Sequence, residues 1–182
     1  MAFWQQNNLE PKRAYRFILS IPGKNFNIPS FLIKSVSKPG FDISESKHEY
    51  LNHTFKYPGK LNWTDVSFKI VDVIGEDDGS GALMSLLEEA GYALPTSENV
   101  KQTISKSRAT AAFGEIYIKQ IDSEGREQEK WTLKNAWVKD VKFGELDYAS
   151  EEMMNVDVTL TYDNAVLSIK KGQYSGNHPS LA

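Results

Sequence analysis

Residues 154–162 read Met-Asn-Val-Asp-Val-Thr-Leu-Thr-Tyr, and this segment gives the clearest indication of the fold class. Its apolar side chains, Met154, Val156, Val158, Leu160 and Tyr162, alternate with polar ones. A period of two places the apolar side chains on one face of a β-strand, because successive side chains point to opposite sides. The stretch therefore predicts a strand with one face in the core.

The same alternation recurs along much of the chain. It predicts further strands at 15–21, 31–37, 66–73, 113–121, 130–134, 136–143 and 165–169, separated by turn-forming residues. One helix is expected after the glycine-rich turn at 75–81, with Ser80 as its N-cap and Gly91 just past its end. Residues 94–112 are expected to form a long connection that contains a weak, short helix. The predicted fold class is mainly β with one flanking helix (α+β).

Residues 47–57, Lys-His-Glu-Tyr-Leu-Asn-His-Thr-Phe-Lys-Tyr, have a strand-like but poorly apolar pattern. This composition predicts an arm or hairpin that leaves the core. An open strand edge of mixed polarity is a liability in a monomer unless a neighbouring molecule covers it. We therefore expect self-association through this segment.

The composition is that of an ordinary globular chain. Of the 182 residues, 40% are apolar and 25% are charged, which predicts one domain over 1–182. We expect an N-terminal arm at 1–12 and a C-terminal extension at 164–182. The sequence shows neither a membrane-spanning stretch nor a signal peptide, so no membrane anchor is expected. Cysteine is absent, which excludes disulfides and thiolate chemistry.

Charge is distributed unevenly around a net value of −3. Residues 1–60 carry nine basic and four acidic side chains, whereas residues 61–182 carry twelve basic and twenty acidic ones. Solvated loops would explain this difference, and so would a molecule with a positive and a negative end. The second alternative would suit head-to-tail self-association, in which one surface docks on a different surface of the next copy.

Motifs for catalysis, metals and cofactors are weak or missing. His48 and His53 resemble a zinc-protease motif, but the second histidine is one position late, and in a single strand the two would point to opposite faces. The acidic turn at 76–78 lacks the ligand spacing of a calcium loop. The sequence contains neither a phosphate loop nor a Gly-x-Ser-x-Gly elbow. We assign no catalytic, cofactor or metal residue, and we expect a protein that is not an enzyme.

Two segments together carry a family resemblance. The first contains Tyr-Arg-Phe at 15–17, Ile-Lys-Ser-Val-Ser-Lys-Pro-Gly at 33–40 and Tyr-Pro-Gly-Lys-Leu-Asn-Trp-Thr-Asp-Val at 57–66. The second contains Leu-Lys-Asn-Ala-Trp-Val-Lys-Asp-Val at 133–141, Leu-Asp-Tyr-Ala-Ser-Glu-Glu at 146–152 and Val-Asp-Val-Thr-Leu-Thr-Tyr-Asp at 156–163. In order and spacing they resemble the tail tube proteins of contractile-tailed bacteriophages, which are related to Hcp and to the tubes of contractile injection systems.

The resemblance implies a fold, an assembly and partners. It implies an antiparallel β-sandwich or barrel of the tail tube/Hcp type, assembled as hexameric rings that stack into a hollow tube. The implied partners are other copies of the chain, a sheath outside, baseplate and tail-end proteins, and DNA that passes through without tight binding. The implied location is the virion tail, assembled in the host cytoplasm. Residues 41–57 match the long loop that reaches neighbouring subunits or rings in this family.

The expected function is therefore that of a structural subunit of a contractile tail tube that delivers DNA into the host. The candidate oligomer-interface residues are Lys34, Lys38, Lys47, His48, Glu49, Tyr50, His53, Phe55 and Tyr57. Two alternatives remain open: a baseplate or tube-end adaptor that stops at one ring, and an Hcp-like subunit of an injection system.

Overall fold

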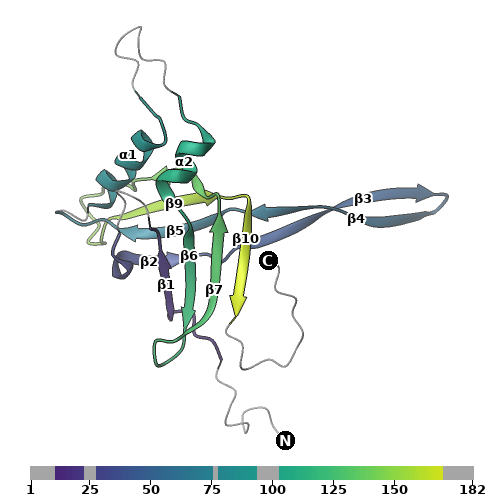
Figure 1. Cartoon of the computed structure of the whole chain (residues 1–182), viewed down its shortest axis with the longest axis horizontal. Helices are drawn as coiled ribbons and strands as arrows, with labels where there is room; N and C mark the ends of the chain where they lie inside the picture. The colour runs from purple at the N-terminus through teal and green to yellow at the C-terminus, as the bar shows by residue number, and fades with distance from the viewer. Residues whose placement is uncertain (1–10, 23–27, 76–77, 94–102, 170–182) are drawn as a thin grey trace, which may run out of the picture.

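Two four-stranded antiparallel sheets form the body of the protein (Figure 1). The computed structural model describes residues 11–22, 28–75, 78–93 and 103–169. The first sheet has the order β1-β6-β7-β10, with β1 at Phe17–Ser20, β6 at Ile116–Ile121, β7 at Glu127–Lys134 and β10 at Asn164–Ile169. The second has the order β2-β5-β9-β8, with β2 at Ile33–Val36, β5 at Val66–Val71, β9 at Asn155–Thr161 and β8 at Trp137–Lys142. A 3₁₀ turn, η2 at Ser30–Leu32, precedes β2.

The core draws its side chains from both sheets and both helices. On β9, Val156, Val158 and Leu160 are fully buried, as their alternation predicts. Their partners on β5 are buried in the same way, because Phe68 lies opposite Val158 in the ladder and cross-strand partners share a face. This register confirms the predicted half-buried strands and the mainly β class.

Helix α1 (Gly79–Glu89) lies beside the sheets with its apolar side chains in the core. The sequence prediction of Ser80 as the N-cap is wrong, because the side chain of Asp78 accepts the hydrogen bond from the Ser80 N–H at 3.1 Å. Asp72 also binds this helix start, since its carboxylate accepts from the Ser80 hydroxyl at 2.7 Å. The predicted glycine after the helix is confirmed: Gly91 has φ +107°.

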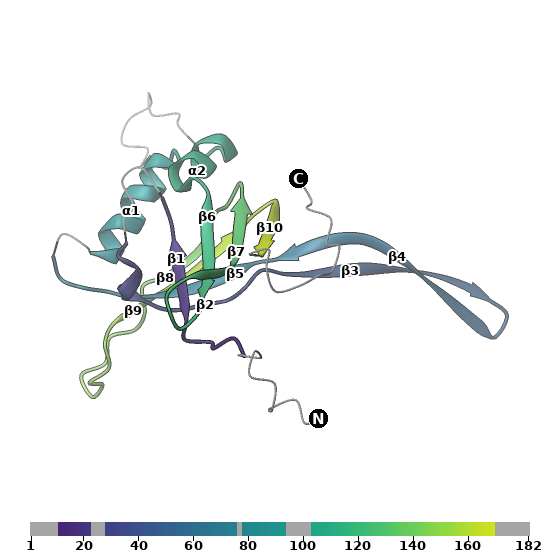
Figure 2. The same ribbon diagram turned by 60° about the horizontal axis from the view of Figure 1, so that its bottom comes forward.

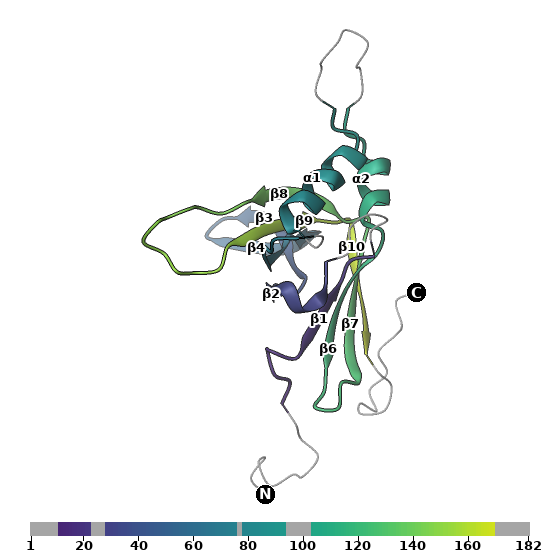
Figure 3. The same cartoon turned by 90° about the vertical axis from the view of Figure 1, so that its left-hand side faces the viewer.

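A second helix, α2 (Lys106–Phe113), packs beside α1 (Figure 3). The sequence predicts only a weak, short helix in a loose connection here. The structure shows a helix with Ser105 as its cap and Ala109, Ala112 and Phe113 buried. The two buried alanines let the helix approach the body closely. Because alanine is only weakly apolar, the sequence of this segment gives little sign that the helix packs on the body. Residues 94–102 of this connection lie outside the described residues.

Parts of both predicted terminal extensions contact the body. Lys12 pairs with Glu129 on β7, and residues 164–169 are strand β10 of the first sheet. Residues 1–10 of the predicted arm and 170–182 of the predicted extension lie outside the described residues. No helix in the described ranges is long and apolar enough to cross a membrane.

Strands β3 (Gly40–Tyr50) and β4 (His53–Thr64) pair only with each other in the described ladders. They form a long two-stranded hairpin that projects from the body (Figures 1 and 2). We call residues 40–64 the hairpin arm.

Candidate assembly interface

The hairpin arm begins where β3 leaves the body and turns back at its tip. Tyr50 lies opposite His53 in the ladder, so Leu51 and Asn52 form the connecting turn. Leu51 adopts φ +52°, the left-handed conformation that tight hairpin turns demand. The sequence prediction that residues 47–57 leave the core is confirmed, and the segment contains the tip of a hairpin rather than one strand.

A β-bulge interrupts the ladder halfway along the hairpin arm. Ile43 lies opposite Leu61, but Glu45 lies opposite Pro58, so β4 holds one extra residue at this point. The hydroxyl of Ser44 fills the gap in the ladder by accepting from the Lys60 N–H at 2.9 Å. A Cβ at Gly59 would lie 2.4 Å from the Ser44 Oγ and 2.8 Å from the Ser44 carbonyl oxygen. The bulge therefore requires glycine at position 59.

The apolar side chains change faces of the ribbon across this bulge. Between the body and the bulge, one face carries Phe41, Ile43, Leu61 and Trp63, which are paired residues of the ladder. The rings of Phe41 and Trp63 meet edge to face with centroids 5.8 Å apart. Phe41 is 59% exposed, so this contact leaves much of its surface in solvent.

Between the bulge and the tip, the opposite face carries the aromatic side chains. The ladder pairs Tyr50 with His53, His48 with Phe55 and Ser46 with Tyr57, so all six residues share this face. The rings of His53 and Phe55 are in edge contact, with centroids 4.6 Å apart. Tyr50, Phe55 and Tyr57 are all exposed. Exposed aromatic side chains in one patch are typical of a protein interface.

The charged side chains of the outer half lie on the other face. The Glu45 carboxylate forms ion pairs with Lys47 at 3.1 Å and with Lys56 at 3.3 Å, which places the three residues together. Over its full length the hairpin arm carries three acidic and three basic side chains besides its two histidines, Asp42, Glu45, Glu49, Lys47, Lys56 and Lys60. The arm therefore has no net formal charge and separates an apolar surface from a charged one.

The two histidines of the arm have a different geometry from the one that the sequence predicts. His48 and His53 share a face of the hairpin, so the prediction that they point to opposite faces, which holds only for a single strand, is wrong. Within the described ranges, no cluster of three or more His, Asp or Glu side chains could hold a metal ion. Residues 76 and 77 of the acidic turn lie outside these ranges.

Two further interface candidates lie before the hairpin arm. Lys34 is an exposed residue of β2. Lys38 is bound within the chain, because its ammonium donates to Gln120 Oε1 at 2.6 Å and to Glu129 Oε1 at 2.8 Å. Since Lys38 lies two residues before β3, these bonds tie the start of the hairpin arm to β6 and β7 of the first sheet.

Glu129 is the centre of this attachment. Its side chain is buried on β7 and accepts from Lys12, Lys38 and the indole Nε1 of Trp131. Burial alone would raise the pKa of this carboxyl, but the hydrogen bonds from the two lysines and the indole outweigh it and lower the pKa to about 2. Glu129 is therefore charged throughout the ordinary pH range and holds two chain segments against the first sheet.

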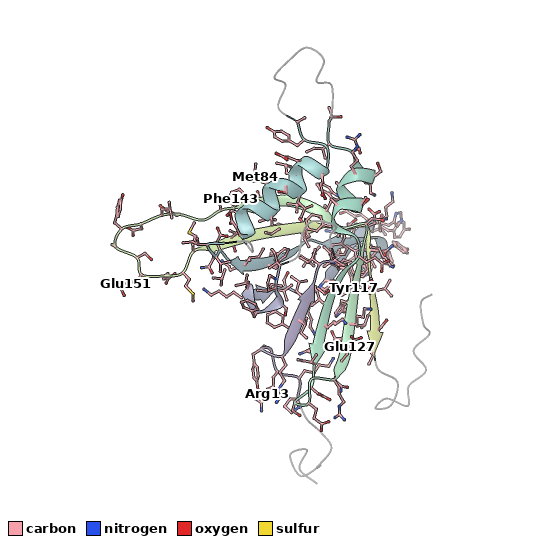
Figure 4. The ribbon with its side chains drawn as sticks, turned by 60° about the vertical axis from the view of Figure 1, so that its left-hand side comes forward. Arg13, Met84, Tyr117, Glu127, Phe143 and Glu151 are labelled. Carbon is pink, nitrogen blue, oxygen red and sulfur yellow. The ribbon has the colours of Figure 1, made fainter. Side chains whose placement is uncertain are left out.

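A second protruding segment connects β8 to β9 and contains the labelled residues Phe143 and Glu151 (Figure 4). Its side chains from 142 to 153 are exposed, including Leu146 and Tyr148. A turn at Asp147 orders its end, because the Asp147 carboxylate accepts from the Ala149 N–H at 3.0 Å. The acidic excess of the chain is strong in and around this segment, at Asp140, Glu145, Asp147, Glu151, Glu152 and Asp157.

Sequence reasoning missed the inner half of the apolar surface. The candidate residues within the hairpin arm all lie in 47–57, so Phe41, Ile43 and Leu61 are not among them. Their alternation at 41 and 43 and at 61 and 63 was a usable signal. It was missed because the ladder partner that completes the patch lies across the hairpin.

Comparison with solved structures identifies the fold. A chain of the cryo-EM structure of the anti-feeding prophage baseplate is 14% identical, with a TM-score of 0.63 over 90% of this chain and 99% of that one. A chain of the sheath-tube complex of an extracellular contractile injection system, PVC, in its extended state is 21% identical, with a TM-score of 0.60 over 93% and 99%. A chain of the anti-feeding prophage cap, described as tube-terminating, is 19% identical, with a TM-score of 0.61 over 93% and 100%.

No protein-family model matches the chain, and a search of curated proteins by sequence finds no match. The structural match covers nearly the whole of each similar chain, so the likeness extends to the complete architecture and is not confined to one sheet. It confirms, at the level of fold, the resemblance that the sequence motifs predict. This chain has the fold found in the tube, cap and baseplate assemblies of contractile injection systems.

Proposed function

We propose that the protein is a structural subunit of a contractile tail tube and that it is not an enzyme. In this proposal, copies of the chain assemble as hexameric rings, the rings stack into a tube inside a sheath, and DNA passes through the tube into the host. The observation that carries the proposal is the end-to-end fold match to a chain of a sheath-tube complex. The predicted baseplate and tail-end partners and the virion location belong to the same proposal.

The hairpin arm supports a self-assembling role on physical grounds. A two-stranded ribbon with its aromatic side chains in solvent is marginally stable at best without a partner surface. Retaining Tyr50, Phe55 and Tyr57 in such a position is a liability for a monomer and an advantage for a subunit. We propose that Lys34, His48 and His53 join these aromatic residues in the contact between copies.

Electron microscopy of concentrated protein in negative stain tests the proposal. A tube subunit gives rings and stacked tubes whose length grows with protein concentration. A monodisperse monomer at every concentration, checked by sedimentation velocity, would contradict the proposal.

A second candidate function is a ring-forming adaptor of the same fold. It is favoured by the matches to chains of a baseplate and of a tube-terminating cap. The two functions differ in where assembly stops. An adaptor gives single rings at every concentration, whereas a tube subunit continues to stack, so the same micrographs distinguish them.

A further inference from the structure

The ribbon of the hairpin arm also turns over between the body and the tip. In Figures 1 and 2, β3 lies below β4 near the body and above it near the tip, so the two strands exchange places along the hairpin arm. Two-stranded ribbons twist more strongly than wide sheets, which accounts for this exchange. A ribbon that turns over brings its opposite face to the same side.

The change of apolar face at the bulge and the turn of the ribbon compensate for each other. The inner apolar residues Phe41, Ile43 and Leu61 lie on one face of the ribbon and the outer aromatic residues on the other, but the ribbon turns over between them. A ribbon that turns over between the two groups would bring both of them to the same side of the hairpin arm. We call this the apolar side, and we call the side with Asp42, Lys47 and Lys56 the polar side.

We propose that the hairpin arm docks along its whole length by the apolar side alone, and that its occupant is a second copy of this chain. The inference rests on the proposed function and deepens it, because it names which half of the arm surface forms the contact. It adds Phe41, Ile43 and Leu61 to the interface and places Lys47 and Glu49 outside it.

The area and the charge of the apolar side fit a protein occupant. Its six large apolar side chains are each about half exposed, which offers about 600 Å² in total at roughly 100 Å² for each residue. A stable interface takes about 800 Å² from each partner, so the apolar side with a polar rim approaches a full contact surface. The hairpin arm has no net formal charge, which argues against a nucleic acid or an anionic lipid surface as its occupant.

The apolar side is also continuous with the core of the body. Trp63 lies against Phe41 on one side and against Tyr162 of the core on the other, at centroid distances of 5.8 and 6.0 Å. A copy that docks on the hairpin arm would thus extend the core of this subunit rather than touch a detached tail. A rigid link of this kind suits subunits that are held at a fixed spacing.

The absence of cysteine from the chain allows a direct test by thiol labelling. Two matched pairs of single substitutions probe adjacent residues on the two sides: His48→Cys with Lys47→Cys in the outer half, and Ile43→Cys with Asp42→Cys in the inner half. Each variant is labelled with a maleimide as dilute monomer and as assembled particles that microscopy has verified.

The proposal predicts that assembly slows labelling of His48→Cys and Ile43→Cys by at least about tenfold, because the centre of an interface excludes solvent. Lys47→Cys and Asp42→Cys should change by less than about twofold, as expected outside the contact. Equal protection from labelling on the apolar and polar sides would overturn one-sided docking and leave the proposed function in place. Protection of only the two outer variants, His48→Cys and Lys47→Cys, would do the same. A wild-type chain that never assembles would overturn both.

Discussion

The body and the hairpin arm use the same sequence pattern with opposite outcomes. On β5, every second side chain is buried, and Val66 and Ile70 have no exposed surface. On β3, alternating Phe41 and Ile43 remain more than half exposed. Alternation in the sequence therefore specifies which side chains share a face of a strand, but not what covers that face. In the body a second sheet covers the face, whereas in the arm nothing among the described residues does.

Shortening the arm should have the largest effect on assembly. Replacing Ser46–Tyr57 with Asn-Gly joins Glu45 to Pro58, which are ladder partners, through a turn that favours hairpins. The body should keep its far-ultraviolet circular dichroism and its melting temperature, because the removed residues are exposed and project from it. Rings and tubes should be lost in micrographs. Unchanged assembly of the shortened chain would show that the outer half of the arm is dispensable.

A pair of phenylalanine substitutions should separate the two regions by stability. Phe68→Ala removes a buried ring from β5 and should lower the free energy of unfolding by about 3–5 kcal/mol. Phe55→Ala on the arm should change it by no more than about 0.5 kcal/mol in the monomer. Urea denaturation of dilute protein measures both. Comparable losses for the two variants would mean that the arm is part of the folded core.

The attachment between the regions should have an intermediate effect. Glu129→Gln leaves Lys12 and Lys38 without their carboxylate and should cost about 1–3 kcal/mol. Glu127→Gln, on the same strand but paired at the surface with Lys119, is the control and should cost less than about 1 kcal/mol. Equal losses in urea denaturation would refute a special role for Glu129.

The bond between Lys38 and Glu129 also makes Lys38→Glu unsuitable as an interface test, because this substitution would place two carboxylates together.

The pH dependence of Glu129 gives a smaller signal with a defined sign. Its folded pKa of about 2 lies below the ordinary value of 4.5, so its contribution to stability is present above pH 4.5. That contribution is lost as the pH falls through the folded pKa. Between pH 5 and about pH 2, the wild-type chain should therefore lose more stability than Glu129→Gln. Parallel curves for the two chains would show that Glu129 is not held as a charged group.

The binding of duplex DNA by the assembled protein should be the smallest of these effects. Six copies with a net charge of −3 each carry about −18, which repels phosphate at long range. We expect no retention of duplex DNA by assembled protein at near-physiological salt in a filter assay. Micromolar binding that weakens steeply with added salt would instead reveal a basic surface that holds nucleic acid.

The sequence alone predicts the body well and the arm only in part. Strand positions such as β9 follow from alternation, because each buried face has a period of two that survives in the chain order. The sequence underestimates helix α2, because two of its three buried residues, Ala109 and Ala112, are small alanines that give only a weak apolar pattern. The shared face of His48 and His53 depends on where the hairpin turns, and neither Leu51 nor Asn52 is a glycine that would have marked it.

The bulge is a second feature of the arm that the sequence alone does not predict. Gly59 follows Pro58 and reads as an ordinary turn in the sequence, yet in the structure it lies within a strand, against Ser44. The swap of apolar face depends on this pairing across the hairpin and on the twist of the ribbon. Neither is encoded by a local pattern, so the apolar side emerges only from the structure.

The most direct measurement compares two triple variants of the hairpin arm by sedimentation velocity and negative-stain microscopy. The first carries Phe41→Ser, Phe55→Ser and Tyr57→Ser on the apolar side, and the second carries Asp42→Ser, Lys47→Ser and Lys56→Ser on the polar side. We predict that the polar-side variant forms the same rings and tubes as the wild-type chain, while the apolar-side variant stays a folded monomer with an unchanged melting temperature. Assembly by the apolar-side variant, or loss of assembly only in the polar-side variant, would contradict the account.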